Sequence, residues 1–302
     1  MTQELIVEHD TEYHYSSAVG FAQHLAHLTP RSLVGQQVQD FRLEIAPPPA
    51  GVQTGADYFG NLRTYFALTA AHEALRVRTH SRVRLQPRFG HVDVGASPAW
   101  EAVRASLQYV AGAPYAAASE FCFRSPRISR DPALGAYARE SFAPGRPLLE
   151  AARDLMQRIH KDFRFDATST DVSTPMLEAF AARAGVCQDF THVMIGCLRS
   201  LGLAASYVSG YLCPQPRSAT APSTAADPTP VGAEASHAWV SVFCPRYGWV
   251  EFDPTNNVIP LTGHVRLAIG RDYGDVAPLR GVVQGGGKHQ LRVAVRVRAA
   301  TE

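Results

Sequence analysis

The stretch GVCQDFTHVMIGCLRSL, residues 185–201, predicts the helix around which the rest of the chain is arranged. Its apolar residues recur at three-and-four spacing, which places them on one side of an α-helix: Phe190, Val193, Met194, Cys197, Leu198 and Leu201. Continued backwards, the same stripe reaches Cys187 in the first turn. Gly185 lets the chain end one helix and begin the next. We therefore predict a buried helix with a cysteine at its N-terminus.

This position makes Cys187 a candidate nucleophile. Unpaired backbone N–H groups and the positive end of the helix dipole stabilise an anion, so a thiol placed there can become a thiolate near neutral pH. Cysteine is also among the residues most often buried, and on a helix it commonly serves as a small core residue. Cys197, in the middle of the stripe, is interpreted as core. For Cys187 this stretch alone leaves both interpretations open.

Length and composition indicate a globular protein of two domains. The chain has 302 residues, of which 46% are hydrophobic and 19% charged, enough apolar material for a proper core. A formal net charge of +2 implies no extended nucleic-acid-binding face. No apolar run of signal-peptide or membrane-spanning length is present, so we expect a cytoplasmic protein that neither binds nor crosses a membrane.

Cysteine and histidine spacing gives no sign of a metal or disulfide framework. The five cysteines are odd in number and widely spread, and no CxxC pair occurs. His24 and His27 are three residues apart without a third ligand. We interpret these two as strand or loop histidines.

The first 85 residues alternate with period two. Apolar or small residues from Leu75 to Leu85 alternate with arginines and a histidine, as in a strand with one solvent-facing side. Further strands are predicted at 5–9, 38–45 and 57–68, the last interrupted by a tight turn at Gly60. Several short strands separated by turns predict an antiparallel sandwich or barrel, the N-terminal β domain of residues 1–90.

After a Gly- and Pro-rich linker at 87–98, the pattern becomes helical and then extended. Helices are predicted at 99–110 and 148–163, followed by a short one that begins at Thr174 and ends near Gly185. A strand is predicted at 204–212. The Ala-, Pro- and Ser-rich segment 213–235 cannot bury enough apolar surface to order itself, so we expect a mobile loop that is either a lid, a partner-binding element or a simple spacer.

A second informative stretch, SHAWVSVFCPRYGWVEFDPTNN, begins at Ser236. It alternates, turns at 245–248 and returns, which predicts an antiparallel hairpin. His237 opens the first strand and Asp253 closes the second, so their side chains can hydrogen-bond if they share a face. For His237 alone, a polar residue at a sheet edge is the better interpretation. Together with a cysteine at a helix N-terminus, the pair favours nucleophilic catalysis.

The segments GVCQDFTH, SHAWVSVF and GWVEFDPTN, in this order and spacing, resemble the transglutaminase-like superfamily. Nearly the whole chain is similar to the bacterial two-domain members, in which a β domain precedes the catalytic core, here residues 98–302. The resemblance implies that Cys187 is the nucleophile, His237 the base and Asp253 the residue that orients the histidine. It also implies an α+β fold with a papain-like core, in which the helix carrying the cysteine packs on an antiparallel sheet carrying the other two.

Other residues near these three are weaker candidates. Gln188 follows the cysteine directly, and Trp239 shares a face with the histidine, so both are candidate neighbours of the oxyanion or the substrate. Trp239 is equally well explained as a packed core indole. Asp189 suits the first helical turn and is interpreted as structural. His192, five residues past Cys187, faces away from it. The backbone N–H of Cys187 is the expected oxyanion donor, and no residue identifies a second one.

The predicted function is therefore cysteine-dependent hydrolysis of an amide or peptide bond through a thioester, with a peptide or protein as substrate. Transfer of the acyl group to an amine is the first alternative, because the same three residues serve both reactions. A non-catalytic binding module, or a component of a peptide-modifying assembly, is the second. Calcium sites of the animal enzymes have no visible counterpart in this sequence, so we expect no metal and no cofactor. The sequence does not predict the oligomeric state.

Overall fold

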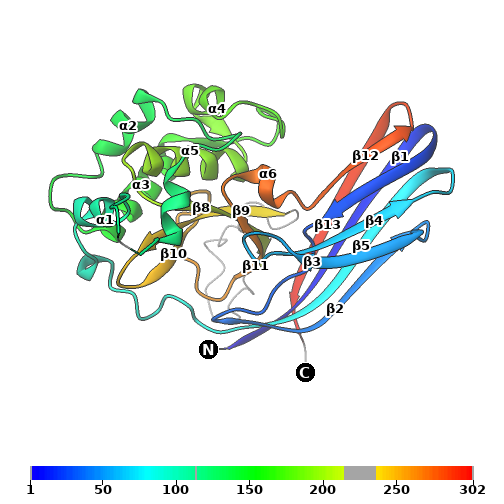
Figure 1. Ribbon diagram of the computed structural model, residues 1–302, viewed down its shortest axis with the longest axis horizontal. Coiled ribbons are helices and arrows are strands. Elements are labelled where there is room, and N and C mark those ends of the chain that lie inside the picture. Colours follow the sequence, from blue (N-terminus) through cyan, green and yellow to red (C-terminus); the bar gives the residue numbers. More distant parts are fainter. Residues whose placement is uncertain (1, 113, 214–235, 301–302) are drawn as a thin grey trace, which may run out of the picture.

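The computed structural model of the protein describes residues 2–112, 114–213 and 236–300. A domain of long strands lies beside a core in which helices cover a smaller sheet (Figure 1). In the described residues the strand domain holds β1 (Gln3–Ala26), β2 (Gln36–Ala46), β3 (Gly51–Ala56), β4 (Leu62–Leu68), β5 (His72–Leu85), β12 (Leu279–Gly285) and β13 (His289–Ala299).

Strand β1 organises the β domain because it pairs on both edges along its length. Its first half lies between β5 and β13, and its second half lies between β4 and β12, all antiparallel. The apolar core of this domain comes from β1, β4, β5 and the segment after β1: Val19, Ala22, Ala26, Leu28, Phe66, Leu68, Leu75 and Val77.

The last residues of the chain do not belong to the catalytic core, which was expected to span residues 98–302. Strands β12 and β13 pair with β1, so residues 279–299 lie in the β domain rather than in the catalytic core. The alternating sequence of β13 is that of a half-exposed strand, but alternation does not say which sheet a strand joins. The partner is the edge of β1 that β4 and β5 leave free.

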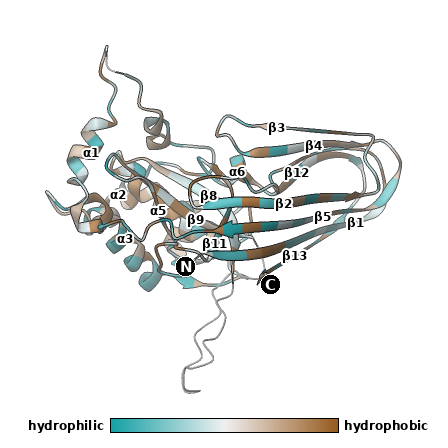
Figure 2. Cartoon of the chain, turned by 90° about the horizontal axis from the view of Figure 1, so that it is seen from below, coloured by the Kyte–Doolittle hydropathy of each residue, from teal (hydrophilic) through white to brown (hydrophobic). Residues whose placement is uncertain are grey.

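The alternation along β5 is confirmed. Leu75, Val77 and Val83 are buried, whereas Arg76 and the other arginines of the strand are exposed. Hydrophilic and hydrophobic residues alternate along β2 and β5 in Figure 2. The strand therefore has one face toward the interior and one charged face toward solvent.

The core is built from short helices and a four-stranded antiparallel sheet, counted over the described residues. The sheet order is β10-β9-β8-β11. In chain order, the helices and strands of the core are η1 (Val94–Ala96), α1 (Trp100–Ser106), η2 (Ala117–Cys122), α2 (Pro132–Arg139), α3 (Leu148–Asp162), β6 (Arg164–Phe165), α4 (Met176–Ala182), β7 (Ala184–Gly185), α5 (Cys187–Ser200), β8 (Ala205–Leu212), β9 (His237–Cys244), β10 (Gly248–Phe252), β11 (His264–Gly270) and α6 (Tyr273–Val276).

Helix α5 is the helix predicted at 187–201, and it lies at the centre of the core. The apolar stripe is buried as predicted, with Phe190, Val193 and Leu198 at 1% exposure or less. Burial extends around nearly the whole helix, because it packs against β8 and β9 as well as against α2, α3 and α4. Cys197 is confirmed as a core residue, and burial raises the pKa of its thiol to about 12.

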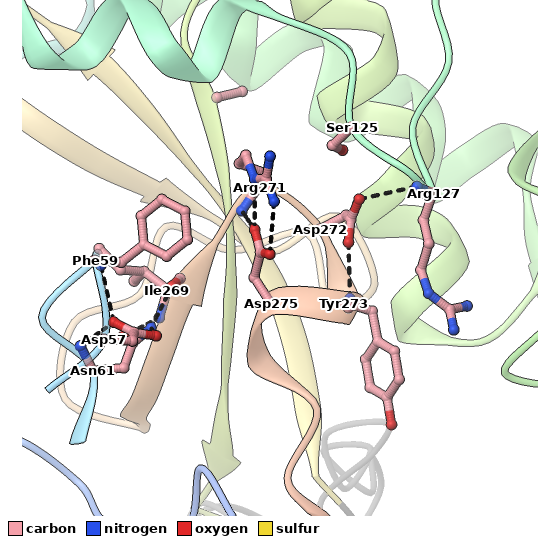
Figure 3. Close-up of polar contacts among 12 residues, drawn as sticks. Asp57, Phe59, Asn61, Ser125, Arg127, Ile269, Arg271, Asp272, Tyr273 and Asp275 are labelled. Carbon is pink, nitrogen blue, oxygen red and sulfur yellow. Dashed lines mark hydrogen bonds and ion pairs between the residues drawn. The ribbon is translucent and has the colours of Figure 1, made fainter. Parts of the chain in front are cut away.

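Two side-chain amides of the β domain cover the edge of the core sheet at β11. Gln36 donates from Nε2 to the carbonyl of Arg266 and accepts from its N–H on Oε1, both at 2.8 Å. Asn61 does the same at Ile269, donating at 2.7 Å and accepting at 2.8 Å (Figure 3). Each amide replaces the two hydrogen bonds that a neighbouring strand would make, so the β domain completes this sheet edge. No helix in the described part of the chain is long and apolar enough to cross a membrane.

Candidate active site

Cys187 is the first residue of α5, and the local sequence holds it there. Asp189 caps the helix by accepting from the backbone N–H of Val186 at 2.8 Å, and Thr170 donates to the same carboxylate oxygen at 2.7 Å. All five cysteines are described, and Cys187 is the only one that is not buried. Cys187 is therefore the cysteine that keeps access to solvent.

Gly185 is required by this cap, not by the end of a preceding helix. A Cβ at position 185 would lie 2.5 Å from Oδ2 of Asp189. The preceding helix α4 ends instead at Arg183, which takes the left-handed conformation with φ 51°. The expected role of Gly185 is thus corrected: it leaves room for the carboxylate that begins α5.

The hairpin of β9 and β10 brings His237 and Asp253 together. Val240 pairs with Phe252 across the two antiparallel strands, which leaves His237 and Asp253 at the same end. Nε2 of His237 lies 2.8 Å from Oδ2 of Asp253, and both side chains are fully buried. The predicted contact between the two residues is present.

The electrostatics of this pair favour a charged histidine. Burial alone lowers the pKa of His237, but the carboxylate of Asp253 and the sulfur of Cys187 outweigh it and raise this pKa to about 10. Burial works to raise the pKa of Asp253, yet the charge of His237 and hydrogen bonds from two histidines hold it well below its usual value. These two shifts favour an imidazolium beside a carboxylate.

Cys187 lies close enough to this histidine to act on it. Its charge, like that of Asp253, raises the pKa of His237. Nε2 is taken by Asp253, while Nδ1 is buried and makes no hydrogen bond among the described residues. One nitrogen is thus held by the carboxylate, and the other is not taken by another described residue.

Gln188 and Trp239 lie beside the three residues in different ways. The Gln188 amide points toward the carbonyl of Val172, with Nε2 at 3.4 Å. The Trp239 indole is fully buried and stacks on the His237 ring, with centroids 6.0 Å apart and planes at 25°. Trp239 therefore packs against the imidazole from within the sheet and does not form an exposed wall.

The other histidines considered in the sequence do not belong to this site. Nε2 of His192 accepts from the backbone N–H of Tyr273 at 3.2 Å, and burial lowers the pKa of His192 to about 3. His24 stacks on Phe66 in the β domain, while His27 lies 3.6 Å from Asp57. Apart from residue 213, the segment expected to be a lid, 213–235, lies outside the described residues.

Three polar neighbours were missed by the sequence reasoning. His264, the first residue of β11, donates from Nε2 to Oδ2 of Asp253 at 3.0 Å. Asn256 donates from Nδ2 to the same oxygen at 2.9 Å. Tyr207 is buried on β8, and burial together with the nearby sulfur of Cys187 raises the pKa of this tyrosine. Asn256 stands within the quoted hairpin stretch, but nothing in the sequence marks His264 as its spatial neighbour.

The polar atoms around Asp253 also have the composition of a metal site. The ligand atoms of His237, Asp253 and His264 lie within 4.8 Å of one another, all buried. Histidine nitrogens and a carboxylate are suitable ligands for zinc and related metals. Their 2.8 Å and 3.0 Å separations are equally those of N–H···O hydrogen bonds, so two interpretations exist for the same atoms.

Two pockets in the described part of the chain lie away from Cys187, His237 and Asp253. One, of about 650 Å³, opens over the charged face of the β domain around Asp10, Arg76 and Arg292. The other, of similar volume, lies beside α5 and is lined in part by Arg127, His192 and Arg271. Asp272 joins its wall to α6 by accepting from the N–H groups of Arg127 and Gly274 (Figure 3). Neither pocket includes the candidate nucleophile.

Comparisons with known proteins agree with this architecture. The model of the bacterial transglutaminase-like N-terminal region matches residues 5–84, and that of the transglutaminase-like superfamily matches residues 135–254. An uncharacterized protein of Mycobacterium tuberculosis is 40% identical over 295 residues, covering 93% of this chain and 88% of its own. One from Mycobacterium leprae is 31% identical, covering 96% and 97%.

A solved structure shares the fold over the whole chain. The crystal structure of a candidate cysteine protease from Cytophaga hutchinsonii superposes with a TM-score of 0.74 at 18% identity, covering 100% of this chain and 92% of its own. The α+β fold class predicted from the sequence is thereby confirmed, as is the predicted family. His264 lies beyond the end of the segment matched by the superfamily model.

Proposed function

Because the chain belongs to the transglutaminase-like superfamily, we propose that it is a cysteine-dependent hydrolase of amide or peptide bonds, with Cys187 as nucleophile, His237 as acid and base, and Asp253 as the residue that orients the histidine. One observation supports this proposal above the others. The buried His237 is bonded through Nε2 to Asp253, and Cys187, the one cysteine that is not buried, lies close enough to help raise the pKa of His237.

In this mechanism the sulfur of Cys187 attacks the carbonyl carbon of the substrate. The C–N bond then breaks, the proton on Nδ1 of His237 passes to the departing amine, and a thioester remains on the sulfur. A water molecule gives a proton to Nδ1 and attacks the thioester carbon. The C–S bond breaks, and a carboxylic acid and the thiolate are released. Asp253 keeps Nε2 protonated throughout, which leaves Nδ1 as the nitrogen that exchanges protons.

The site supplies charge stabilisation from two directions. The raised pKa of His237 favours an imidazolium, which stabilises a thiolate at Cys187. The N–H of Cys187 lies in the first turn of α5, where helix N–H groups are unpaired and the dipole favours negative charge. We propose this N–H as one donor to the oxyanion.

The test is the rate at which iodoacetamide alkylates Cys187 between pH 5 and 9, followed by peptide mass. The proposal predicts fast labelling already at pH 6, and labelling slowed by about a hundredfold or more at that pH in His237→Ala and Asp253→Ala. Asp10→Ala, on the far face of the β domain, is the matched control and should label like the wild type. Labelling of the wild type that rises only at alkaline pH, and is unchanged in the two variants, would contradict the proposal.

A peptide library then distinguishes water from an amine as acceptor. Products are read by mass with and without added hydroxylamine, which competes for the thioester. We expect carboxylic acid products from the library alone, and hydroxamates when hydroxylamine is present. Conversion seen only when an amine is supplied would replace hydrolysis with acyl transfer.

A further inference from the structure

Asp253 is surrounded by hydrogen-bond donors on both of its oxygens. Oδ1 accepts from the backbone N–H groups of Thr255 at 3.0 Å and Asn256 at 3.2 Å. Oδ2 accepts from Asn256 Nδ2 at 2.9 Å, from His237 at 2.8 Å and from His264 at 3.0 Å. An ionised carboxylate without solvent contact needs such a set of donors, because every lone pair left unpaired costs free energy.

The pKa values of the two histidines on Oδ2 are shifted in opposite directions. The pKa of His237 is raised, whereas burial lowers the pKa of His264 and outweighs the hydrogen bond and the charge of Asp253, which act to raise it. Asp253 holds one positive charge, on the histidine that faces Cys187. His264 therefore serves as a neutral imidazole with its proton on Nε2, which is the form that donates to Oδ2.

Packing keeps His264 in the place where it can do this. The Trp239 indole packs against both rings, stacked on His237 and edge-on to His264 with centroids 5.0 Å apart and planes at 83°. On the intervening strand β8 the residue opposite His237 is Gly210, where a Cβ would lie 2.5 Å from the indole and 2.1 Å from the carbonyl of Val265. Small size at position 210 lets the rings converge across the strand.

The backbone of His264 is held from the side of the β domain. Arg88, in the segment that joins the two domains, donates from Nη2 to the carbonyl of His264 at 3.1 Å. Two residues further along the same strand, the side-chain amide of Gln36 on β2 hydrogen-bonds the backbone of Arg266. The ionisable side chains that act on His264 are Asp253, His237 and Glu251, the last of which is also paired with Arg88.

We infer that His264 is a positioning residue of the proposed triad: its Nε2–H fixes the carboxylate of Asp253 in the orientation that holds His237 toward Cys187. This inference rests on the proposed function. It also gives the β domain a part in the site, because strand β11, which carries His264, is held by Gln36 and Asn61.

The experiment compares His264→Leu, which removes the donor at similar size, with His264→Gln, which keeps an N–H donor on a neutral side chain. Alkylation of Cys187 is followed across pH 5 to 9, and thermal unfolding midpoints are recorded for both variants. We expect labelling at pH 6 to fall about tenfold or more in His264→Leu and to stay within about threefold of the wild type in His264→Gln, since a hydrogen bond to a charged group is lost in only one of them. Equal slowing in both variants, or in neither, would overturn the inference.

A second readout does not depend on the reactivity of Cys187. In protein labelled with ¹⁵N at histidine, NMR reports which nitrogens of His237 carry protons and how rigid the ring is. We expect a sharp Nε2–H signal of His237 in the wild type and in His264→Gln, and a broadened or shifted one in His264→Leu. If Cys187 proves unreactive, the proposed function fails while this signal still decides the role of His264. An Nε2–H signal that is the same in all three proteins would refute that role.

The same residues could instead be metal ligands, and the experiment separates the two roles. The wild type is measured after treatment with EDTA and after addition of zinc. A positioning role predicts that EDTA leaves both the labelling rate and the His237 signal unchanged. Loss of the Nε2–H signal on binding of one equivalent of zinc, together with recovery by EDTA, would assign these atoms to a metal and overturn the inference.

Discussion

Carboxylates face cationic side chains in two regions of the molecule, and the regions differ in burial. On the charged face of the β domain, Asp10 of β1 pairs with Arg76 and Arg78 of β5, whose side chains are 44% and 48% exposed. In the core, Glu251 of β10 lies between Arg88 at 3.1 Å and Arg266 at 3.0 Å and has no exposed surface. In both regions a carboxylate lies beside two guanidinium groups, but the surroundings differ.

The difference indicates that burial, more than pairing, decides how strongly a charged residue affects the free energy of unfolding. In water the attraction between two charges is small and screened by salt, and ordering the side chains offsets much of it. In the interior both charges have lost their hydration, so removing one partner leaves an uncompensated charge. Asp253 belongs to the second kind, and there the requirement for a partner coincides with the chemistry proposed for the site.

The largest predicted effect on stability is a pH dependence set by the buried His237. Its pKa is raised from about 6.5 to about 10, so above pH 6.5 the folded protein keeps a proton that the unfolded chain releases. The stabilisation is complete below pH 6.5 and is lost as pH rises toward 10, with an upper bound of about 5 kcal/mol at 1.36 kcal/mol per pKa unit.

Urea unfolding at pH 6 and pH 9 measures this dependence. The free energy of unfolding should fall with pH in the wild type and fall less in His237→Gln. The surface pair behaves in the opposite way: hydrogen bonding to Arg76 lowers the pKa of Asp10, so its stabilisation is lost only as pH falls through that lowered value. An identical loss between pH 6 and 9 in wild type and His237→Gln would show that other groups cause it.

Glu251→Ala should destabilise the protein by about 3–5 kcal/mol, because Arg88 and Arg266 would remain buried without a counter-charge. Burial already lowers the pKa of Arg266, the direction expected for a cation with little solvent. The measurement is the free energy of unfolding from urea titration. Replacing Glu251 by Leu and both Arg88 and Arg266 by Met removes all three charges, and it should recover part of the lost stability. A loss below about 1 kcal/mol in Glu251→Ala would mean that this buried group of charges contributes no more to stability than the surface pairs do.

Gln36→Ala should lower the free energy of unfolding by about 1–3 kcal/mol, because the backbone N–H and C=O of Arg266 at the sheet edge would lose their hydrogen-bond partner. The neighbouring Gln37, which is exposed on the same strand, gives the matched control Gln37→Ala, expected within about 0.5 kcal/mol of the wild type. Hydrogen exchange at the amides of β11 locates the effect. Faster exchange spread evenly over the core, with none concentrated in β11, would argue against a local clamp.

Local patterns predicted the parts of the site that depend on nearby residues. The three-and-four spacing located α5 and its cysteine, and the hairpin pattern placed His237 and Asp253 at the same end of the hairpin. Patterns could not place β11, β12 or β13 in their sheets, because alternation defines the faces of a strand and says nothing of its neighbours. His264 was missed for the same reason: its contact with Asp253 depends on strand order in the sheet and on the cover supplied by Gln36 and Asn61, more than 200 residues away.

The smallest predicted effect belongs to the surface ladder. Asp10→Ala removes contacts with Arg76 and Arg78, yet these arginines stay hydrated, so we expect a loss of less than about 1 kcal/mol. The loss should shrink further between 0.05 M and 0.5 M sodium chloride, since salt screens exposed pairs. The loss in Glu251→Ala should be nearly independent of salt over the same range. A salt-insensitive loss of several kcal/mol in Asp10→Ala would mean that the cross-strand charges of β1 stabilise the β domain as a buried network does, and burial would no longer explain the contrast between the two regions.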